Sequence, residues 1–129
     1  MIPKFRVWDK EINYLDYDVR VTTTDKYEKV EVLDGFSDWR KIEENNYVIM
    51  RNTGLRDKKG NYIYEGDICA SYNGFEAEYN KIEWSDKDCT WMIEGDFTVD
   101  YLRDFLRHSS LEVIGNIYEN PELLEEDEE

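Results

Sequence analysis

The chain has 129 residues, with 31 Asp and Glu against 16 Lys and Arg, and a formal net charge of −15. This excess argues against an ordinary DNA- or phosphate-binding protein, which needs a basic surface to displace counterions. The 40% hydrophobic and 15% aromatic content argues against wholesale disorder. The sequence contains no apolar run of membrane-spanning length, and its first six residues lack the apolar core of a signal peptide. We therefore expect a cytoplasmic protein that does not enter a membrane.

The negative charge is unevenly distributed. Residues 1–60 carry twelve acidic and twelve basic side chains, whereas residues 61–118 carry twelve acidic against four basic ones, a balance of −8. Residues 119–129 add seven acidic side chains and no basic one. The last five residues, 125–129, are all acidic and are expected to form a disordered tail.

The first third of the chain predicts short β-strands. Residues 4–8, 19–24 and 28–33 alternate apolar and polar side chains with a period of two, and Phe5 and Trp8 are expected to anchor the core. Residues 36–46 are polar and are expected to form a loop or a helical turn. Residues 1–46 therefore read as an N-terminal β-segment.

Further strands are expected at residues 47–51, 62–64, 68–72, 76–84, 90–94 and 111–118, separated by turn residues. Gly66 suits a tight turn that requires a positive φ, and Asn73-Gly74 is the strongest hairpin signal in the chain. Within residues 76–84 the alternation slips by one position, which suggests a β-bulge.

One helix is expected late in the chain. Thr98 is its predicted N-cap, and Leu102, Phe105 and Leu106 form an apolar stripe with helical spacing. The only histidine, His108, falls in the last turn, where the helix dipole favours a cation. A short helix is expected over residues 119–124.

These elements predict a mostly β fold with minor α content: a small bent barrel over residues 47–118, with the N-terminal β-segment, one inserted helix and a short C-terminal helix. Residues 1–124 are expected to form a single domain, because a second core would have too few residues.

The residue types that commonly form catalytic or metal sites do not occur here in a pattern that defines such a site. Cys69 and Cys89 both read as strand residues, and buried thiols are favoured over a disulfide in a cytoplasmic protein. With one His and no Cys-x-x-Cys pair, no soft-metal site has enough ligands, and Asp86-Lys87-Asp88 lacks the pattern of a calcium-binding loop. Glu65 and Asp67 flank a glycine, without the partners that would define a reaction. We therefore expect no catalytic, metal or cofactor site.

The aromatic residues, four Trp, ten Tyr and five Phe, are the other unusual feature of the sequence. Base stacking on a β-surface would need an electropositive groove beside them, so core and interface packing is the better interpretation. The acidic residues 61–118, which we call the acidic half, allow an alternative interpretation. Their spaced carboxylates could imitate a DNA backbone and occupy the DNA-binding groove of another protein.

Three blocks of sequence, in order, resemble the YopX-like proteins of phages and prophages. They are Asn52-Thr53-Gly54-Leu55-Arg56-Asp57-Lys58-Lys59-Gly60, then Ile63-Tyr64-Glu65-Gly66-Asp67-Ile68, then residues 112–124, which begin Glu112-Val113-Ile114-Gly115-Asn116. Residues 3–10 also fit the N-terminus of that family, so the resemblance extends over the whole chain. Arg51-Asn52 departs from it, because the family usually has Gln and an aromatic residue there.

The resemblance implies a small SH3-like barrel decorated by an N-terminal β-segment and encoded in a mobile element of a Gram-positive bacterium. It implies no activity, because no catalytic residues carry over, and it is consistent with self-association. The residues expected to hold this fold together are Trp8, Thr53, Gly54, Leu55, Tyr64, Glu65, Gly66, Asp67, Gly115 and Asn116.

Three hypotheses for function follow. The leading one is a non-enzymatic accessory protein of phage or prophage origin that contacts a host or phage protein and forms a homo-oligomer. The second is an acidic DNA mimic that inhibits a host nucleic-acid enzyme. The third, which the sequence favours least, is an enzyme or small-ligand binder with a pocket between barrel and helix. Direct binding to nucleic acid is not expected.

Overall fold

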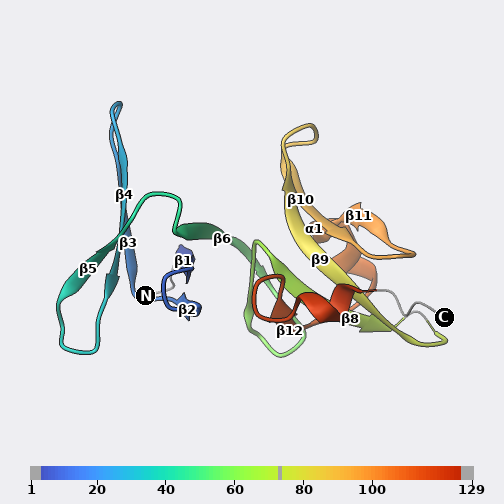
Figure 1. The fold of residues 1–129 in the computed structure, drawn as a ribbon. Coiled ribbons are helices and arrows are strands. Elements are labelled where there is room, and N and C mark those ends of the chain that lie inside the picture. The colour runs from blue at the N-terminus through green and yellow to red at the C-terminus, as the bar shows by residue number, and fades with distance from the viewer. Residues whose placement is uncertain (1–3, 73, 126–129) are drawn as a thin grey trace. The chain divides into compact units, whose positions relative to one another are not determined.

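The computed structural model describes residues 4–72 and 74–125, and the chain forms two compact units, Met1–Asn52 and Thr53–Glu129 (Figure 1). The strands are β1 (Phe5–Asp9), β2 (Tyr14–Asp16), β3 (Val19–Thr23), β4 (Glu28–Leu33), β5 (Trp39–Ile42), β6 (Tyr47–Arg56), β7 (Tyr62–Tyr64), β8 (Asp67–Tyr72), β9 (Ala77–Ser85), β10 (Thr90–Glu94), β11 (Val99–Tyr101) and β12 (Glu112–Asn116). The helices are α1 (Leu102–His108) and the 3-10 turn η1 (Pro121–Leu124). The predicted fold class, mostly β with a minor helix, is confirmed. Of the expected acidic tail, residues 126–129 lie outside the described residues.

The first unit is built on alternating β-branched residues. Strands β3, β4 and β5 form an antiparallel sheet, and β1 pairs with β2 and with the first half of β6. One face of the β3–β5 sheet contributes Val30, Val32 and Ile42 to a core that also contains Val7. Phe5 and Trp8 are half-buried, so Val7 rather than either aromatic residue is the core position of β1.

The segment expected to be a loop or helical turn contains a strand instead. Residues Trp39–Ile42 form β5, which pairs with β4 so that Ile42 lies opposite Val30. Ile42 is 1% exposed, and this single buried contact selects the extended conformation in an otherwise polar segment.

Ion pairs bring opposite charges together in the first unit, whose residues 1–52 carry eleven acidic and nine basic side chains. Arg40 contacts both the buried Asp9 carboxylate and Glu11, the latter at 2.9 Å. On the other face of the β3–β5 sheet, Arg20 and Lys29 approach Glu31 at 2.9 and 3.5 Å. Opposite charges therefore lie side by side in this unit.

The second unit is a curled antiparallel sheet in the order β11-β10-β9-β8-β12. Its core contains Ile63, Cys69, Ile82, Ile93, Leu102 and Leu111. Phe105 and Leu106 of α1 pack against this core, as the predicted apolar stripe requires. The helix contacts β10 and β11.

The helix begins later than the sequence predicts. Thr98 was expected to cap it, but residues Val99–Tyr101 form strand β11, and Tyr101 occupies the N-cap position. β11 pairs with β10, with Val99 opposite Glu94, while the Thr98 hydroxyl donates to the Glu78 carboxylate. Sheet pairing and this hydrogen bond therefore outweigh the local capping signal.

The two cysteines occupy different environments, although both were expected in strands. Cys69 is fully buried in β8, whereas Cys89 lies in the turn between β9 and β10, exposed and with a φ of 52°. Both belong to the described part of the chain, and neither forms a disulfide bond. The expectation of two buried thiols is wrong for Cys89.

Asp57 joins two distant segments of the second unit. Its Oδ1 accepts the amide N–H groups of Lys59 and Asn61 at 3.0 and 2.8 Å, and its Oδ2 accepts that of Val113, 56 residues away, at 3.0 Å. Burial raises the pKa of this carboxyl, but the amides of Val113, Asn61 and Lys59 outweigh burial and lower the pKa overall. The ionised form therefore stabilises the fold.

Replacing Asp57 with Ala should destabilise the second unit by about 3 kcal/mol, because three amides lose their acceptor. The free energy of unfolding, measured with denaturant, checks this. Because the pKa of Asp57 is lowered in the fold, the difference between wild type and Asp57→Ala should be largest near neutral pH. It should shrink as the pH falls through the folded-state pKa. An equal loss in the exposed Asp86→Asn control would contradict the assignment.

Candidate functional site

Strand β9 presents alternate side chains to two different environments. Glu78, Asn80 and Ile82 point inward and are buried, whereas Ala77 and Tyr79 are exposed. The strand pairs with β8 and β10 without any break in register, so the predicted bulge in this strand is wrong. The apparent slip arises because two inward positions are polar. The observed bulge lies in β12, between Val113 and Gly115.

The two inward polar residues of β9 have partners inside the unit. The Asn80 side-chain amide lies 3.0 Å from Ser71 Oγ and 3.3 Å from the Cys69 carbonyl. The Glu78 carboxylate accepts the Phe97 amide at 2.9 Å and the Thr98 hydroxyl at 3.0 Å. A buried carboxylate with two donors is well satisfied. Glu78 therefore fixes the turn between β10 and β11.

Gly95 allows that turn to lie close to β9. A Cβ at this position would meet Asn80 Oδ1 closer than real Cβ contacts allow, and would lie 2.7 Å from Glu78 Oε1 and 3.0 Å from the Tyr79 carbonyl oxygen. The absence of a side chain is therefore a packing requirement here.

An open groove with a volume of about 460 Å³ lies beside this turn. It is lined by residues 76–79, Lys81, residues 94–97 and residues 123–125. We call it the acidic groove. Its lining combines carboxylates with apolar side chains, the latter including Tyr79, Phe97 and Leu123. Among the described residues that line it, Lys81 is the one basic side chain.

Two carboxylates lie side by side at the border of the acidic groove. A hydrogen bond with Glu83 and the charge of Glu83 raise the pKa of Glu94, with burial adding to the effect, while Lys81 opposes it. The Lys81 ammonium lies 3.5 Å from Glu83. The Glu94 carboxyl therefore holds its proton to a higher pH than an isolated glutamate does.

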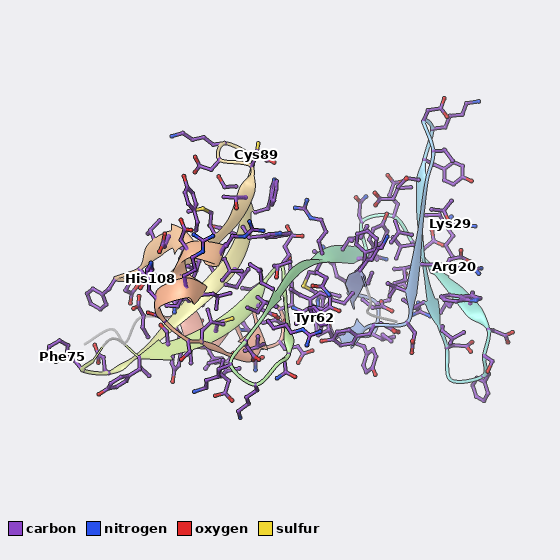
Figure 2. The ribbon with its side chains drawn as sticks, turned by 180° about the vertical axis from the view of Figure 1, so that it is seen from behind. Arg20, Lys29, Tyr62, Phe75, Cys89 and His108 are labelled. Atoms are coloured by element: carbon purple, nitrogen blue, oxygen red, sulfur yellow. The ribbon has the colours of Figure 1, made fainter. Side chains whose placement is uncertain are left out.

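Large apolar side chains gather at the end of the sheet that borders the acidic groove. Tyr72, Phe75, Phe97 and Val99 are 70, 92, 78 and 72% exposed. They flank the β8–β9 and β10–β11 turns, which an antiparallel sheet places at the same end. We call these four residues the apolar end. Figure 2 shows Phe75 at the tip of its hairpin, whereas Cys89 marks the opposite end of the sheet.

The residues predicted to hold the barrel together lie away from the acidic groove. Thr53 donates its hydroxyl to the Ile63 carbonyl at 2.7 Å and accepts the Leu55 amide at 3.1 Å. Gly54, between them, has a φ of 79°, and Leu55 packs against the core.

The second predicted block forms a turn. The buried Asp67 carboxylate accepts the Tyr64 amide at 2.7 Å. Gly66 has a φ of 84°, and its amide donates to the Ile82 carbonyl at 2.8 Å. Glu65 is half-buried beside it. Asp67 thus supports the turn from within, as part of the backbone hydrogen-bond network.

The third block forms the end of β12. The Asn116 side-chain oxygen accepts the amides of Tyr118 and Glu119 at 3.0 and 2.9 Å. Gly115 lies against the side chain of Asn120, where a Cβ would collide with it. Trp8, the remaining predicted residue, is half-buried in β1 of the first unit. None of the ten predicted structural residues is among those that line the acidic groove.

The residues considered above as possible catalytic or metal-binding groups do not form a cluster either. His108 is exposed at the end of α1, and Asp86 and Asp88 lie in the β9–β10 turn. Across residues 4–72 and 74–125, no group of three or more His, Cys, Asp or Glu side chains could hold a metal ion. Within the same residues no helix is long and apolar enough to cross a membrane.

This geometry defines the class of the molecule: a small antiparallel β protein with one helix and an open acidic groove bordered by exposed apolar side chains. The family model described as YopX protein matches residues 4–125. The chain therefore belongs to the YopX family.

Two solved structures have a similar fold over nearly the whole chain. Protein yopX from Bacillus subtilis matches with a TM-score of 0.69 at 22% identity, covering 97% of this chain and 100% of that one. Protein EF1440 from Enterococcus faecalis matches with a TM-score of 0.60 at 28% identity, covering 97% of this chain and 99% of that one. No curated protein shows significant sequence similarity to the chain.

Gly95→Ala should lower the stability of the second unit by about 1–3 kcal/mol, because the new methyl group displaces the buried side chains of Glu78 and Asn80. Thermal unfolding followed by circular dichroism checks this. Gly35→Ala is the matched control, since a Cβ there meets nothing within 4 Å. Equal melting temperatures for the two variants would contradict the close approach.

Glu94 should titrate above the ordinary glutamate value of 4.5, and Glu83→Gln should move its midpoint back toward that value. Carboxyl chemical shifts followed by NMR during a pH titration measure both. Because the pKa of Glu94 is raised in the fold, the ionised Glu94 opposes folding above that pKa, so Glu83→Gln should also raise the melting temperature at neutral pH. That gain should fade at low pH. An unshifted Glu94 midpoint in Glu83→Gln would show that the two groups are independent.

Proposed function

We propose that this YopX-family chain is a phage- or prophage-encoded accessory protein that acts in the host cytoplasm by contact with another protein. The observation that carries the proposal is the apolar end, where four large side chains are 70–92% exposed beside the acidic groove. Large exposed apolar side chains that gather in one region of a folded protein often mark interaction surfaces, and aromatic residues are enriched in them.

A non-enzymatic role accords with the use of the buried carboxylates. Asp57, Asp67 and Glu78 each accept backbone amides, which commits them to holding turns and strand ends. The exposed thiol of Cys89 accords with a reducing compartment such as the cytoplasm. Self-association belongs to the same proposal, with a second copy of the chain as the contacted protein.

DNA mimicry is the alternative function, and it has weaker support. A mimic presents spaced carboxylates to its target, whereas several carboxylates of the acidic half have partners within the unit. Glu112 pairs with Lys59 at 2.6 Å, and Asp104 lies 3.7 Å from Arg107. The negative charge of this half is therefore smaller at the surface than the count of its acidic residues suggests.

Phe97→Ser should reduce the recovery of partner proteins from host lysate on the immobilised chain. Truncating an anchoring aromatic residue costs about 2 kcal/mol of binding free energy or more, so recovery should fall several-fold. Phe97 holds the turn through its backbone amide, which the substitution keeps. Quantitative mass spectrometry of the retained proteins measures the effect.

Phe36→Ser is the matched control, since Phe36 is 88% exposed in the first unit. Light scattering of wild type and Phe97→Ser tests whether a second copy is the partner. If the bound proteins are released by high salt and still bind the Phe97→Ser variant as well as wild type, the result would favour mimicry and overturn the proposal.

A further inference from the structure

The acidic groove brings negative charge and apolar surface together within one binding volume. Glu76, Glu94, Asp96 and Glu125 contribute carboxylates, while Tyr79 and Leu123 are among the apolar residues that line it. Its volume, about 460 Å³, lies in the range of sites that enclose small molecules or a few side chains. An occupant must therefore suit both kinds of surface.

The charge around the groove is incompletely balanced within the described residues. Lys81 is its one described basic side chain, and Lys81 lies 3.5 Å from Glu83, which does not itself line the groove. Glu94 hydrogen-bonds with Glu83, and the charge of Glu83 raises the pKa of the Glu94 carboxyl. A cationic group in the groove beside Glu94 and Asp96 would be attracted by both carboxylates and would favour the ionised form of Glu94.

The apolar surface continues beyond the groove. Phe97 lines the groove and also belongs to the apolar end, together with Val99 at the same turn and with Tyr72 and Phe75 at the β8–β9 hairpin. The occupant that uses this surface is therefore longer than a single side chain. An extended polypeptide, whose side chains alternate between two directions, meets both requirements.

We propose that the acidic groove and the apolar end bind a basic segment of a partner protein, in which Lys or Arg residues alternate with large apolar ones. The proposal rests on the protein-contact function above and specifies the chemistry of the partner. The cationic groups lie against Glu94 and Asp96, and an apolar side chain lies against Phe97. Charge complementarity selects the segment, and the apolar contacts supply the larger part of its affinity.

A displayed library of random short peptides, selected on the immobilised full-length chain at physiological salt, tests the proposal. We expect enrichment of sequences with Lys or Arg at alternate positions between aromatic or aliphatic residues. For a selected peptide measured by fluorescence anisotropy, the double variant Glu94→Gln, Asp96→Asn should weaken binding about tenfold, which equals about 1.4 kcal/mol. Phe97→Ser should weaken it by a similar factor.

The control variant Asp86→Asn, Asp88→Asn removes the same charge at the opposite end of the sheet. It should change the affinity less than about twofold if the charges act locally, since exposed charges further apart than a Debye length are screened. Circular dichroism confirms that each variant is folded. Equal weakening by both double variants would show non-specific attraction to an acidic protein and would overturn the proposal.

The remaining outcomes distinguish a failure of the basic-partner inference from a failure of the protein-contact function. Neutral or acidic peptides that depend on Phe97 would overturn the basic-partner inference and leave the protein-contact function standing. Peptides whose affinity is unchanged by every groove and apolar-end variant would overturn both the basic-partner inference and the protein-contact function. Failure to enrich any peptide would overturn the inference that a linear segment is the ligand.

Discussion

The Asp57 carboxylate links segments that are far apart in sequence, and the second unit depends on that link. It binds the turn after β6 and the first residues of β12, the edge strand of the curled sheet. Lys58 adds a backbone hydrogen bond to the Leu111 carbonyl at 2.9 Å beside it. Leu111 belongs to the core, so these polar contacts also fix where an apolar residue enters. Hydrogen bonds of this kind set register, while burial supplies most of the free energy.

Alternation predicted the strands well where apolar residues faced the core, as in β3 and β4. It was least informative where the inward side chain was polar. Glu78 and Asn80 point inward on β9, so the sequence of a regular strand resembled that of a bulged one. The short strands β5 and β11 were missed for a related reason, since each is selected by pairing with its neighbour rather than by its own composition.

The candidate site was harder to predict than the fold. The resemblance to the YopX family is carried by turn-forming blocks, whose residues the structure places in backbone hydrogen bonds and close packing. The acidic groove instead joins residues 76–79 and Lys81 with residues 94–97 and 123–125, which only the three-dimensional fold brings together. The sequence positions of Phe75 and Phe97 were the one signal for this site. Each lies in a turn among polar residues, where a large apolar side chain is left exposed.

Because one cysteine is exposed and the other is buried, thiol labelling can measure how often the core of the second unit becomes exposed. Cys89 stands exposed at the hairpin tip opposite the apolar end, whereas Cys69 lies in the core of the second unit. A thiol reagent therefore attaches at one defined position in the folded state, remote from the acidic groove. The second thiol reacts only when the core is exposed, so the rate of its labelling reads the frequency of that event directly.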